Sequence, residues 1–359
     1  MRLTCIFVLL FSLAATAQDS DAIREHMKVI RDRRTTLAGK VPAMEALLEL
    51  GVEGPRQLAR SLSKTLEDAT GEFNRDADKF LTRFEAAAVR TGESRGDRGK
   101  PARVEELRKT ILTNARNQEL TKEQVIAESD PALEELTKLF HVSLDQVYAQ
   151  DKRLTNEFFE LLKQLQANQR LYGYYARARA LLMADGDAKR LLKQLEDIAD
   201  PSTEEARLSK EQQRIVLRSL PMSENDRRIL LENESNADEI DAHEAAGILE
   251  LNLIRIRCGL GALRIDTKLC DAGRGHSQDM NELEFFDHVS PVEGKKTFGD
   301  RASKAGTSAS AENIARGQTS GKAVISSWWH SPGHHRNMLA PATRIGIGRF
   351  EWHWTQLFG

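Results

Sequence analysis

Helix-forming residues dominate the first two-thirds of this chain, and this bias is the strongest constraint on its fold. From residue 19 to residue 235 the sequence is rich in Leu, Ala, Glu, Lys, Arg and Gln, has few glycines and contains no tryptophan. Residues of these types have high helix propensities. We therefore predict about seven or eight helices, separated at breaks such as Asp130-Pro131 and the polar run before Pro101.

Two apolar stripes indicate how these helices pack. The residues of each stripe are three, four or seven positions apart, the spacing that places side chains on one face of a helix. One stripe comprises Leu58, Leu62, Leu66, Phe73, Phe80 and Phe84, and the other runs from Leu144 through Val147, Leu154, Phe158, Leu161 and Leu165 to Leu182. The heptad-like spacing of the second stripe favours partner helices. Residues 18–236 are therefore expected to form an α-helical bundle or array, with self-association through this region as one expected use.

The first 17 residues have the features of a signal peptide. Arg2 supplies a positive charge, Ile6 to Leu13 form an apolar run, and Ala15-Thr16-Ala17 fits a cleavage site. The run is shorter than the roughly 20 residues that span a bilayer. We therefore expect a secreted or periplasmic protein, cleaved near Ala17, with no transmembrane span.

The charge balance argues against one class of partner. The chain has 52 basic and 54 acidic residues, which give a net charge of -2, and 30% of its residues are charged. Nucleic-acid binding requires a basic excess on one face of a domain. The sequence therefore predicts a soluble protein that does not bind nucleic acid.

A second domain is expected from residue 237 to residue 359. The polar run near residues 233–238 precedes a new apolar periodicity, and Gly259 and Gly261 end the helix that follows. Further helices are expected at residues 267–284, 299–305 and 321–329. Cys258 and Cys270 remain after signal cleavage, and in an exported protein they either form a disulfide or stay as buried thiols. The sequence leaves both alternatives open.

Histidines and acids gather between residues 285 and 337. This block contains His288, Asp300, Glu312, His330, His334 and His335, separated by Gly, Ser and Pro, and the four tryptophans (Trp328, Trp329, Trp352, Trp354) lie in or just after it. No G-x-S-x-G sequence is present to offer an activated serine. The block is therefore the candidate site of the chain.

The motifs of this C-terminal region resemble those of the CAP superfamily, which joins cysteine-rich secretory proteins, antigen 5 and pathogenesis-related 1 proteins with bacterial SCP-like extracellular proteins. The matching motifs include Asn252-x-x-Arg255-x-x-x-Gly259-Leu260, Phe285-Phe286-x-His288-x-Ser290-Pro291, Asp300-Arg301-Ala302, Glu312-Asn313-Ile314-Ala315, Ser331-Pro332-Gly333-His334, Asn337-Met338-Leu339, Gly346-Ile347-Gly348 and Trp354-Thr355-Gln356. The resemblance covers about residues 240–359 and implies an α-β-α sandwich. The alternating residues 344–350 and 352–358 independently predict two strands of that fold. The fold class expected for the whole chain is thus α+β, a CAP-like sandwich preceded by a long helical region.

The resemblance also implies a cleft in which two histidines and two acids meet. Three of these map to His288, Glu312 and His334, and the fourth family position, a glutamate about eleven residues after the first histidine, falls on Gly299. Asp300 is the nearest substitute. His288 and His334 would be the metal ligands, because two neutral imidazoles with carboxylates suit Zn²⁺. The alternative is that His288 and Glu312 hydrogen-bond each other without metal. We expect His335 to be exposed, and His330 and His353 to lie at a surface or interface. The tryptophans are expected to pack around the last strands, and the alternative for Trp329 is that it lines a ligand groove.

Two functions remain open on the sequence. One is an exported binding module whose cleft holds an apolar, lipid-like or peptide ligand, or a component of the cell envelope. The other is a metal-assisted hydrolase, protease- or esterase-like, in which Glu312 acts as general base beside Zn²⁺ and His334. The departure from the tetrad at Asp300 favours the binding module, so no catalytic residue is assigned outright.

Overall fold

The computed structural model describes residues 19–96, 99–199 and 201–359, which form two compact units. The first unit comprises residues up to Ala87 together with Leu144–Ile215, and the second comprises Ala88–Ser143 together with Val216–Gly359. The expected boundary at 236/237 therefore differs from the observed division, because the second unit also includes residues 88–143 and 216–236. The predicted signal peptide lies outside the described residues. Within the described ranges, no helix is both long and apolar enough to cross a membrane.

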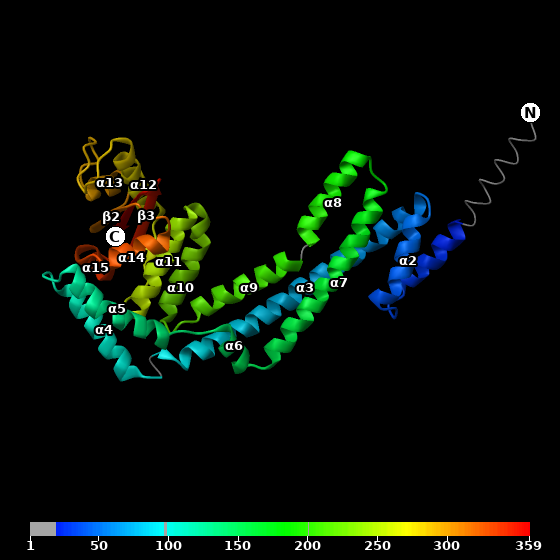
Figure 1. Cartoon of the computed structure of the whole chain (residues 1–359), viewed down its shortest axis with the longest axis horizontal. Helices are drawn as coiled ribbons and strands as arrows, with labels where there is room; N and C mark the ends of the chain where they lie inside the picture. Colours follow the sequence, from blue (N-terminus) through cyan, green and yellow to red (C-terminus); the bar gives the residue numbers. More distant parts are fainter. Residues whose placement is uncertain (1–18, 97–98, 200) are drawn as a thin grey trace, which may run out of the picture. The chain divides into compact units, whose positions relative to one another are not determined.

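The first unit is built from helices, as its composition predicts (Figure 1). Residues 19–31 are helical. The helices that follow are α2 (Leu37–Glu49), α3 (Glu53–Glu93, which continues into the second unit), α6 (Leu144–Gln150), α7 (Arg153–Ala180), α8 (Asp185–Ala199) and α9 (Pro201–Arg218). The stripe from Leu58 to Phe84 is buried along α3, and the Phe80 ring lies 5.8 Å from that of Phe158 on α7. The two predicted stripes thus meet in one core.

The second unit contains a four-stranded sheet. Its strands are β1 (Arg264–Ile265), β2 (Ala311–Arg316), β3 (Arg344–Phe350) and β4 (His353–Phe358), in the order β1-β3-β4-β2. The β1 and β3 strands are parallel, whereas β4 pairs antiparallel with both β3 and β2. The two strands predicted from alternation are therefore confirmed as the hairpin β3–β4.

Helices cover both faces of this sheet, as the expected sandwich requires (Figure 1). One face carries α12 (Thr267–Glu282), which also contacts α13 (Phe298–Lys304), and the other carries α11 (Ala242–Arg257), α14 (Gly321–Trp329) and α15 (Pro332–Leu339). α12 lies so close to β3 that a Cβ atom on Gly348 would come within 1.8 Å of the Arg274 backbone nitrogen. The glycine of the Gly346-Ile347-Gly348 motif at position 348 is therefore needed for this helix to rest on the strand.

A pair of helices from the expected helical region belongs to this unit as well. α4 (Pro101–Arg116) contacts α15, and α5 (Lys122–Leu139) contacts α11, while α10 (Glu224–Asn236) and the 3-10 turn η2 (Ala237–Glu239) lead into the sandwich. Buried side chains of α4 and α5 share one apolar core with the sandwich. This core includes Leu107, Ile111 and Leu136 from the two helices and Ile248, Leu251 and Trp328 from the sandwich. The predicted break at Asp130-Pro131 is wrong. A proline within a helix removes one backbone hydrogen bond, and here α5 continues through it with Ala132 and Leu136 buried.

The two cysteines are free thiols buried in this core. Burial raises the pKa of both Cys258 and Cys270 to about 12, because the charged thiolate is disfavoured away from water. Of the two alternatives that the sequence left open, the structure shows unpaired thiols.

Candidate functional site

Three elements of the sandwich bring His288, Glu312 and Arg301 together. His288 lies on the loop between α12 and α13, Arg301 on α13 and Glu312 on β2. The Nδ1 atom of His288 is 2.9 Å from one carboxylate oxygen of Glu312, and the Arg301 guanidinium donates to the other oxygen at 2.5 Å. The side chains of Arg301 and Glu312 are each 1% exposed, whereas that of His288 is 51% exposed. The half-exposed imidazole of His288 is therefore hydrogen-bonded to the buried ion pair of Arg301 and Glu312.

The electrostatics of His288 follow from this arrangement. The hydrogen bond to Glu312 raises the pKa of His288 above its usual value, with burial acting in the opposite direction. Because a carboxylate accepts hydrogen bonds, Nδ1 carries the proton and the neutral ring keeps its lone pair on Nε2. Nε2 is consequently the atom of His288 that remains available to a ligand.

His334 lies on α15, near enough to His288 for the two rings to interact electrostatically. Burial, together with the nearby His288, lowers the pKa of His334 to about 4, so the ring is neutral at pH 7. A chain of amides fixes α15 against β2: the Asn337 side chain donates to the Glu312 backbone oxygen at 3.1 Å and to the Asn313 side chain at 2.8 Å. Asn313 in turn donates to the Gln356 side chain at 2.8 Å. The structure therefore brings His288 and Glu312 into contact and places His334 on the neighbouring helix, near enough for the charge of His288 to affect it.

The fourth candidate, Asp300, does not join this cluster. Its carboxylate accepts from the Thr297 backbone N–H and hydroxyl, both at 2.9 Å, and forms the capping box of α13. These hydrogen bonds lower the pKa of Asp300, and its side chain faces solvent. The neighbouring Arg301 contacts Glu312 instead. A threonine three residues before an acidic residue is a sequence signature of a capping box. The spacing of Thr297 and Asp300 therefore indicated a capping role for Asp300, which the expected tetrad did not take into account.

Three other expectations for side chains near this site are corrected. His335 is buried rather than at a surface, and its Nδ1 atom lies 2.9 Å from the Trp329 backbone oxygen. His353 is also buried. Trp329 does not line a groove, because its buried ring donates to the Asp130 carboxylate at 2.9 Å. His330 lies at an interface, as expected, 3.0 Å from the same carboxylate.

The residues of the cluster do not fit a zinc ion. Among the described residues, no three His, Cys, Asp or Glu side chains are grouped so that they could hold a metal. The Glu312 oxygens are occupied by His288 and Arg301, and Asp300 faces away in its capping box. The predicted alternative, a direct hydrogen bond between His288 and Glu312, is the arrangement present.

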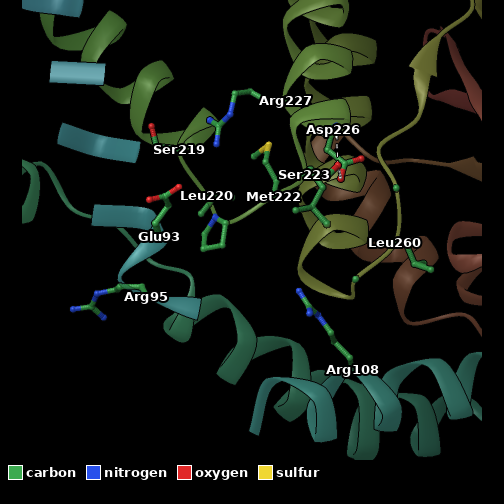
Figure 2. A pocket seen from close by; sticks show the side chains of 14 residues that line it. Glu93, Arg95, Arg108, Ser219, Leu220, Met222, Ser223, Asp226, Arg227 and Leu260 are labelled. Atoms are coloured by element: carbon green, nitrogen blue, oxygen red, sulfur yellow. Dashed lines mark hydrogen bonds between the residues drawn. The ribbon is translucent and has the colours of Figure 1, made fainter. Parts of the chain in front are cut away.

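A cavity of about 420 Å³ elsewhere in the second unit is less suited to bind a ligand. Figure 2 shows arginines, Glu93 and Met222 around it. Several of its polar groups already hold the fold: Asp226 accepts from the Ala262 backbone N–H, and Arg108 donates to the Arg257 backbone oxygen. The charged side chains of Asp226 and Arg108 are thus engaged by backbone groups of the same unit.

The motif residues that suggested the family mostly hold backbone segments in place. Asn252 makes two hydrogen bonds to Leu263, and Arg255 donates to the backbone oxygens of Met338 and Ala340. Trp328 donates to the Ile314 oxygen. These contacts fix β1, α15 and β2 relative to α11 and α14.

A family model and several known proteins match the C-terminal part of this chain. Residues 249–351 match the CAP family model, the cysteine-rich secretory protein family. The chain is 38% identical over 132 residues to the uncharacterized protein YkwD of Bacillus subtilis (strain 168), covering 34% of this chain and 49% of YkwD. It is 34% identical over 113 residues to the uncharacterized membrane protein YlbC of the same organism, covering 31% of this chain and 33% of YlbC. The chain thus spans about half of the first relative and a third of the second.

Two solved structures are also similar to part of this chain. An extracellular protein containing a SCP domain from Bacillus anthracis str. Ames has 30% sequence identity and a TM-score of 0.31, covering 38% of this chain and 44% of that chain. An outer surface protein from Borrelia burgdorferi has 22% identity and a TM-score of 0.28, covering 31% of this chain and 87% of that chain. The family match includes His288, Arg301, Glu312 and His334. The C-terminal third of this chain thus contains a CAP domain, which the model of the cysteine-rich secretory protein family matches at residues 249–351.

Proposed function

We propose that this protein is an exported binding module whose CAP domain holds an apolar or peptide ligand next to His288. The observation that carries the proposal is the loop that presents His288. Three large apolar side chains on this loop are unusually exposed: Leu283 at 55%, Phe286 at 46% and Val289 at 51%. Exposed apolar side chains gathered beside a polar group are typical of a binding surface.

The polar part of this surface favours recognition by hydrogen bonds. Nε2 of His288 is available, and the neutral His334 is near enough to interact electrostatically with His288. Glu312, in contrast, has both carboxylate oxygens engaged, so that service as a general base requires one of these hydrogen bonds to break. This difference supports binding over the expected Glu312-centred hydrolysis.

One observation keeps a hydrolase as the second candidate. A carboxylate that orients the Nδ1–H of a histidine, with Nε2 directed elsewhere, is the base–orienter arrangement of many hydrolases. In that role His288 would take a proton from water and Glu312 would stabilise the resulting imidazolium. The general base would then be His288, and no metal takes part in the step.

Titration of the full-length protein with two probes tests the binding proposal. One probe is a fluorescent fatty acid with a twelve-carbon chain, and the other is the peptide N-acetyl-Leu-Phe-amide. We expect saturable binding of one probe, weakened at least about tenfold in the double variant Phe286→Ser/Val289→Ser, because the apolar contact is lost. Leu249→Ser, at an exposed leucine on α11, is the matched control and should leave binding unchanged.

The outcomes separate the two candidate functions. Equal binding by wild type and by the double variant contradicts the proposed surface. Turnover of p-nitrophenyl acetate that persists with a chelator and disappears in His288→Ala would instead establish the hydrolase.

A further inference from the structure

A groove of about 650 Å³ in the first unit collects basic side chains from separate segments of the chain. They come from the end of the helix at residues 19–31 and the loop after it, from the start of α2, and from α3. The charged lining consists of five basic side chains (Arg31, Arg33, Lys40, Arg60 and Lys64) and two acidic ones (Asp68 and Glu72). The groove thus has an excess of positive charge, whereas the whole chain has a net charge of -2.

The basic side chains of this groove are not neutralised by contacts within the protein. In the part of the chain that the structure describes, none of the five forms a hydrogen bond or an ion pair, and all but the partly buried Lys40 are exposed. Other exposed cations of the same unit pair with an acid three residues earlier on their own helix. Examples are the pairs Arg24–Asp21, Lys163–Glu160 and Arg190–Asp187.

Two nearby acids that could pair with the groove are engaged elsewhere. Asp32 accepts from the Thr35 hydroxyl at 2.6 Å and from the Arg34 backbone N–H at 3.0 Å. Glu53 accepts from the side chains of Arg56 at 2.8 Å and Gln57 at 2.7 Å. Lys40 and Arg60 lower the pKa of these two carboxyls only as charges at a distance. The cations of the groove therefore keep their hydrogen-bond donors for a ligand.

The apolar core of the unit fixes the backbone that carries these cations. Ile30 lines the groove, is 6% exposed, and belongs to the same core as Leu58 and Leu62 of α3. Arg60 and Lys64 are four residues apart, so they lie on one side of α3. Binding would consequently order side chains on a backbone that is already in place, which lowers the entropic cost.

The chemistry of the lining narrows the class of ligand. A guanidinium binds phosphate oxygens with two parallel hydrogen bonds, and an ammonium binds them as a point charge. Single-stranded nucleic acids are typically held by aromatic side chains that stack on the bases, and the described residues that line this groove include no aromatic one. Surfaces that lie on a bilayer present apolar side chains to it, whereas the large apolar side chain here, Ile30, is buried.

We propose that this groove binds a linear polyanion made of repeated phosphate groups that carry no bases. Cations from the separate segments contact successive phosphates along the polymer. The site belongs to the first unit and does not depend on the His288 surface of the second. The protein thus has a polyanion site on its helical unit in addition to the ligand surface of its CAP domain.

Titration of the full-length protein with inorganic polyphosphate, by calorimetry and by anisotropy of an end-labelled chain, tests the proposal. Wild type should bind saturably, and its affinity should fall at least about tenfold between roughly 50 and 200 mM salt, because phosphate contacts release condensed counterions. The triple variant Arg31→Gln/Arg60→Gln/Lys64→Gln should bind at least about tenfold more weakly, with a shallower dependence on salt. Because no hydrogen bond or ion pair is removed, its circular dichroism spectrum should equal that of wild type.

A matched control separates the groove from net charge. Arg24→Gln/Lys163→Gln/Arg190→Gln also removes two arginines and one lysine, at exposed positions that do not line the groove. Its affinity for polyphosphate should stay within about twofold of wild type. Equal weakening in the two triple variants would show that only the overall charge matters, and would overturn the proposal.

Two further probes, at the same concentration of phosphate groups, distinguish other sources of phosphate. Tighter binding to phosphatidylglycerol vesicles than to polyphosphate overturns the proposal in favour of a membrane surface. Tighter binding to oligothymidylate overturns it in favour of nucleic acid, and a wild type that does not bind polyphosphate saturably also overturns it. None of these results affects ligand binding at the Phe286 surface, so the two proposals fail separately.

Discussion

Burial of the Arg301–Glu312 pair imposes a stability cost on every variant that removes one partner. Moving two charges from water into a protein interior is expensive, and the cost is recovered only when each charge keeps its partner and its hydrogen bonds. Here the pair has three backbone carbonyls and His288 around it. Loss of the arginine would leave the glutamate charge buried without its counterion.

We predict that Arg301→Met lowers the free energy of unfolding by about 3–5 kcal/mol, the range for breaking a buried ion pair. The comparison variant is Lys322→Met, whose partner Glu250 is 4.0 Å away and whose own side chain is 77% exposed. An exposed pair contributes about 0–1 kcal/mol. Urea unfolding of both variants, followed by circular dichroism, measures the difference; equal losses would show that the Arg301 pair adds no more than a surface contact.

Sequence reasoning proposed His288, Glu312 and His334 for the site and did not include Arg301, whose guanidinium contacts Glu312. His288, Glu312 and His334 come from motifs whose spacing is tied to the fold, so the family resemblance brought them together. Asp300 and Arg301 are neighbours, and the choice between them depends on which one faces β2 from α13. That orientation is set by the capping box at Thr297 and by packing against the loop at Lys295, which spacing alone does not contain.

At the scale of elements, the attachment of α5 to α14 is the contact that sequence reasoning had no means to anticipate. Asp130 lies 199 residues before Trp329 and accepts the hydrogen bond of its indole. Helix periodicity predicted that helices exist in this region, since it is a local property. Which surface a helix packs against depends instead on residues far away in the sequence. The apolar stripe of α5 has the same spacing whether α5 packs on another helix of the helical region or on the CAP domain.

We predict that Asp130→Ala weakens this attachment by about 1–3 kcal/mol, because the buried Trp329 N–H loses its acceptor. Hydrogen exchange of α14 amides and urea unfolding both report the change. Glu134→Ala, on the same helix, removes only an exposed pair with Lys138 and should change stability by less than about 1 kcal/mol. If the two variants lose the same amount of stability, the hydrogen bond of Asp130 does not hold α5 against α14.

At the scale of the whole molecule, buried histidines make the stability of the second unit sensitive to acid. Burial lowers the pKa of His276, His334 and His335 to about 4, well below the usual 6.5, and it also lowers the pKa of His353. The unfolded chain therefore binds more protons than the folded chain between about pH 6.5 and pH 4, and stability falls as the pH falls through this window. The pKa of His288 is raised, so this residue acts in the opposite sense.

We accordingly predict a lower urea midpoint at pH 5.0 than at pH 7.0. His335→Gln should reduce the difference between the two midpoints, because one of the buried imidazoles is gone. His141→Gln, at an exposed position, is the control and should leave the difference as it is in wild type. A midpoint that stays constant or rises on acidification would contradict the assignment of these histidines as neutral in the folded protein.

The division of the chain into units also sets an order for its folding. Residues 88–143 are separated from the rest of their unit by the 72 residues from Leu144 to Ile215. Their apolar partners on α11, α14 and β3 follow later still, so α4 and α5 must wait for the far end of the polypeptide before they can bury Leu107 and Leu136. We therefore expect these two helices to expose an apolar stripe during synthesis, until the later elements of their unit have formed.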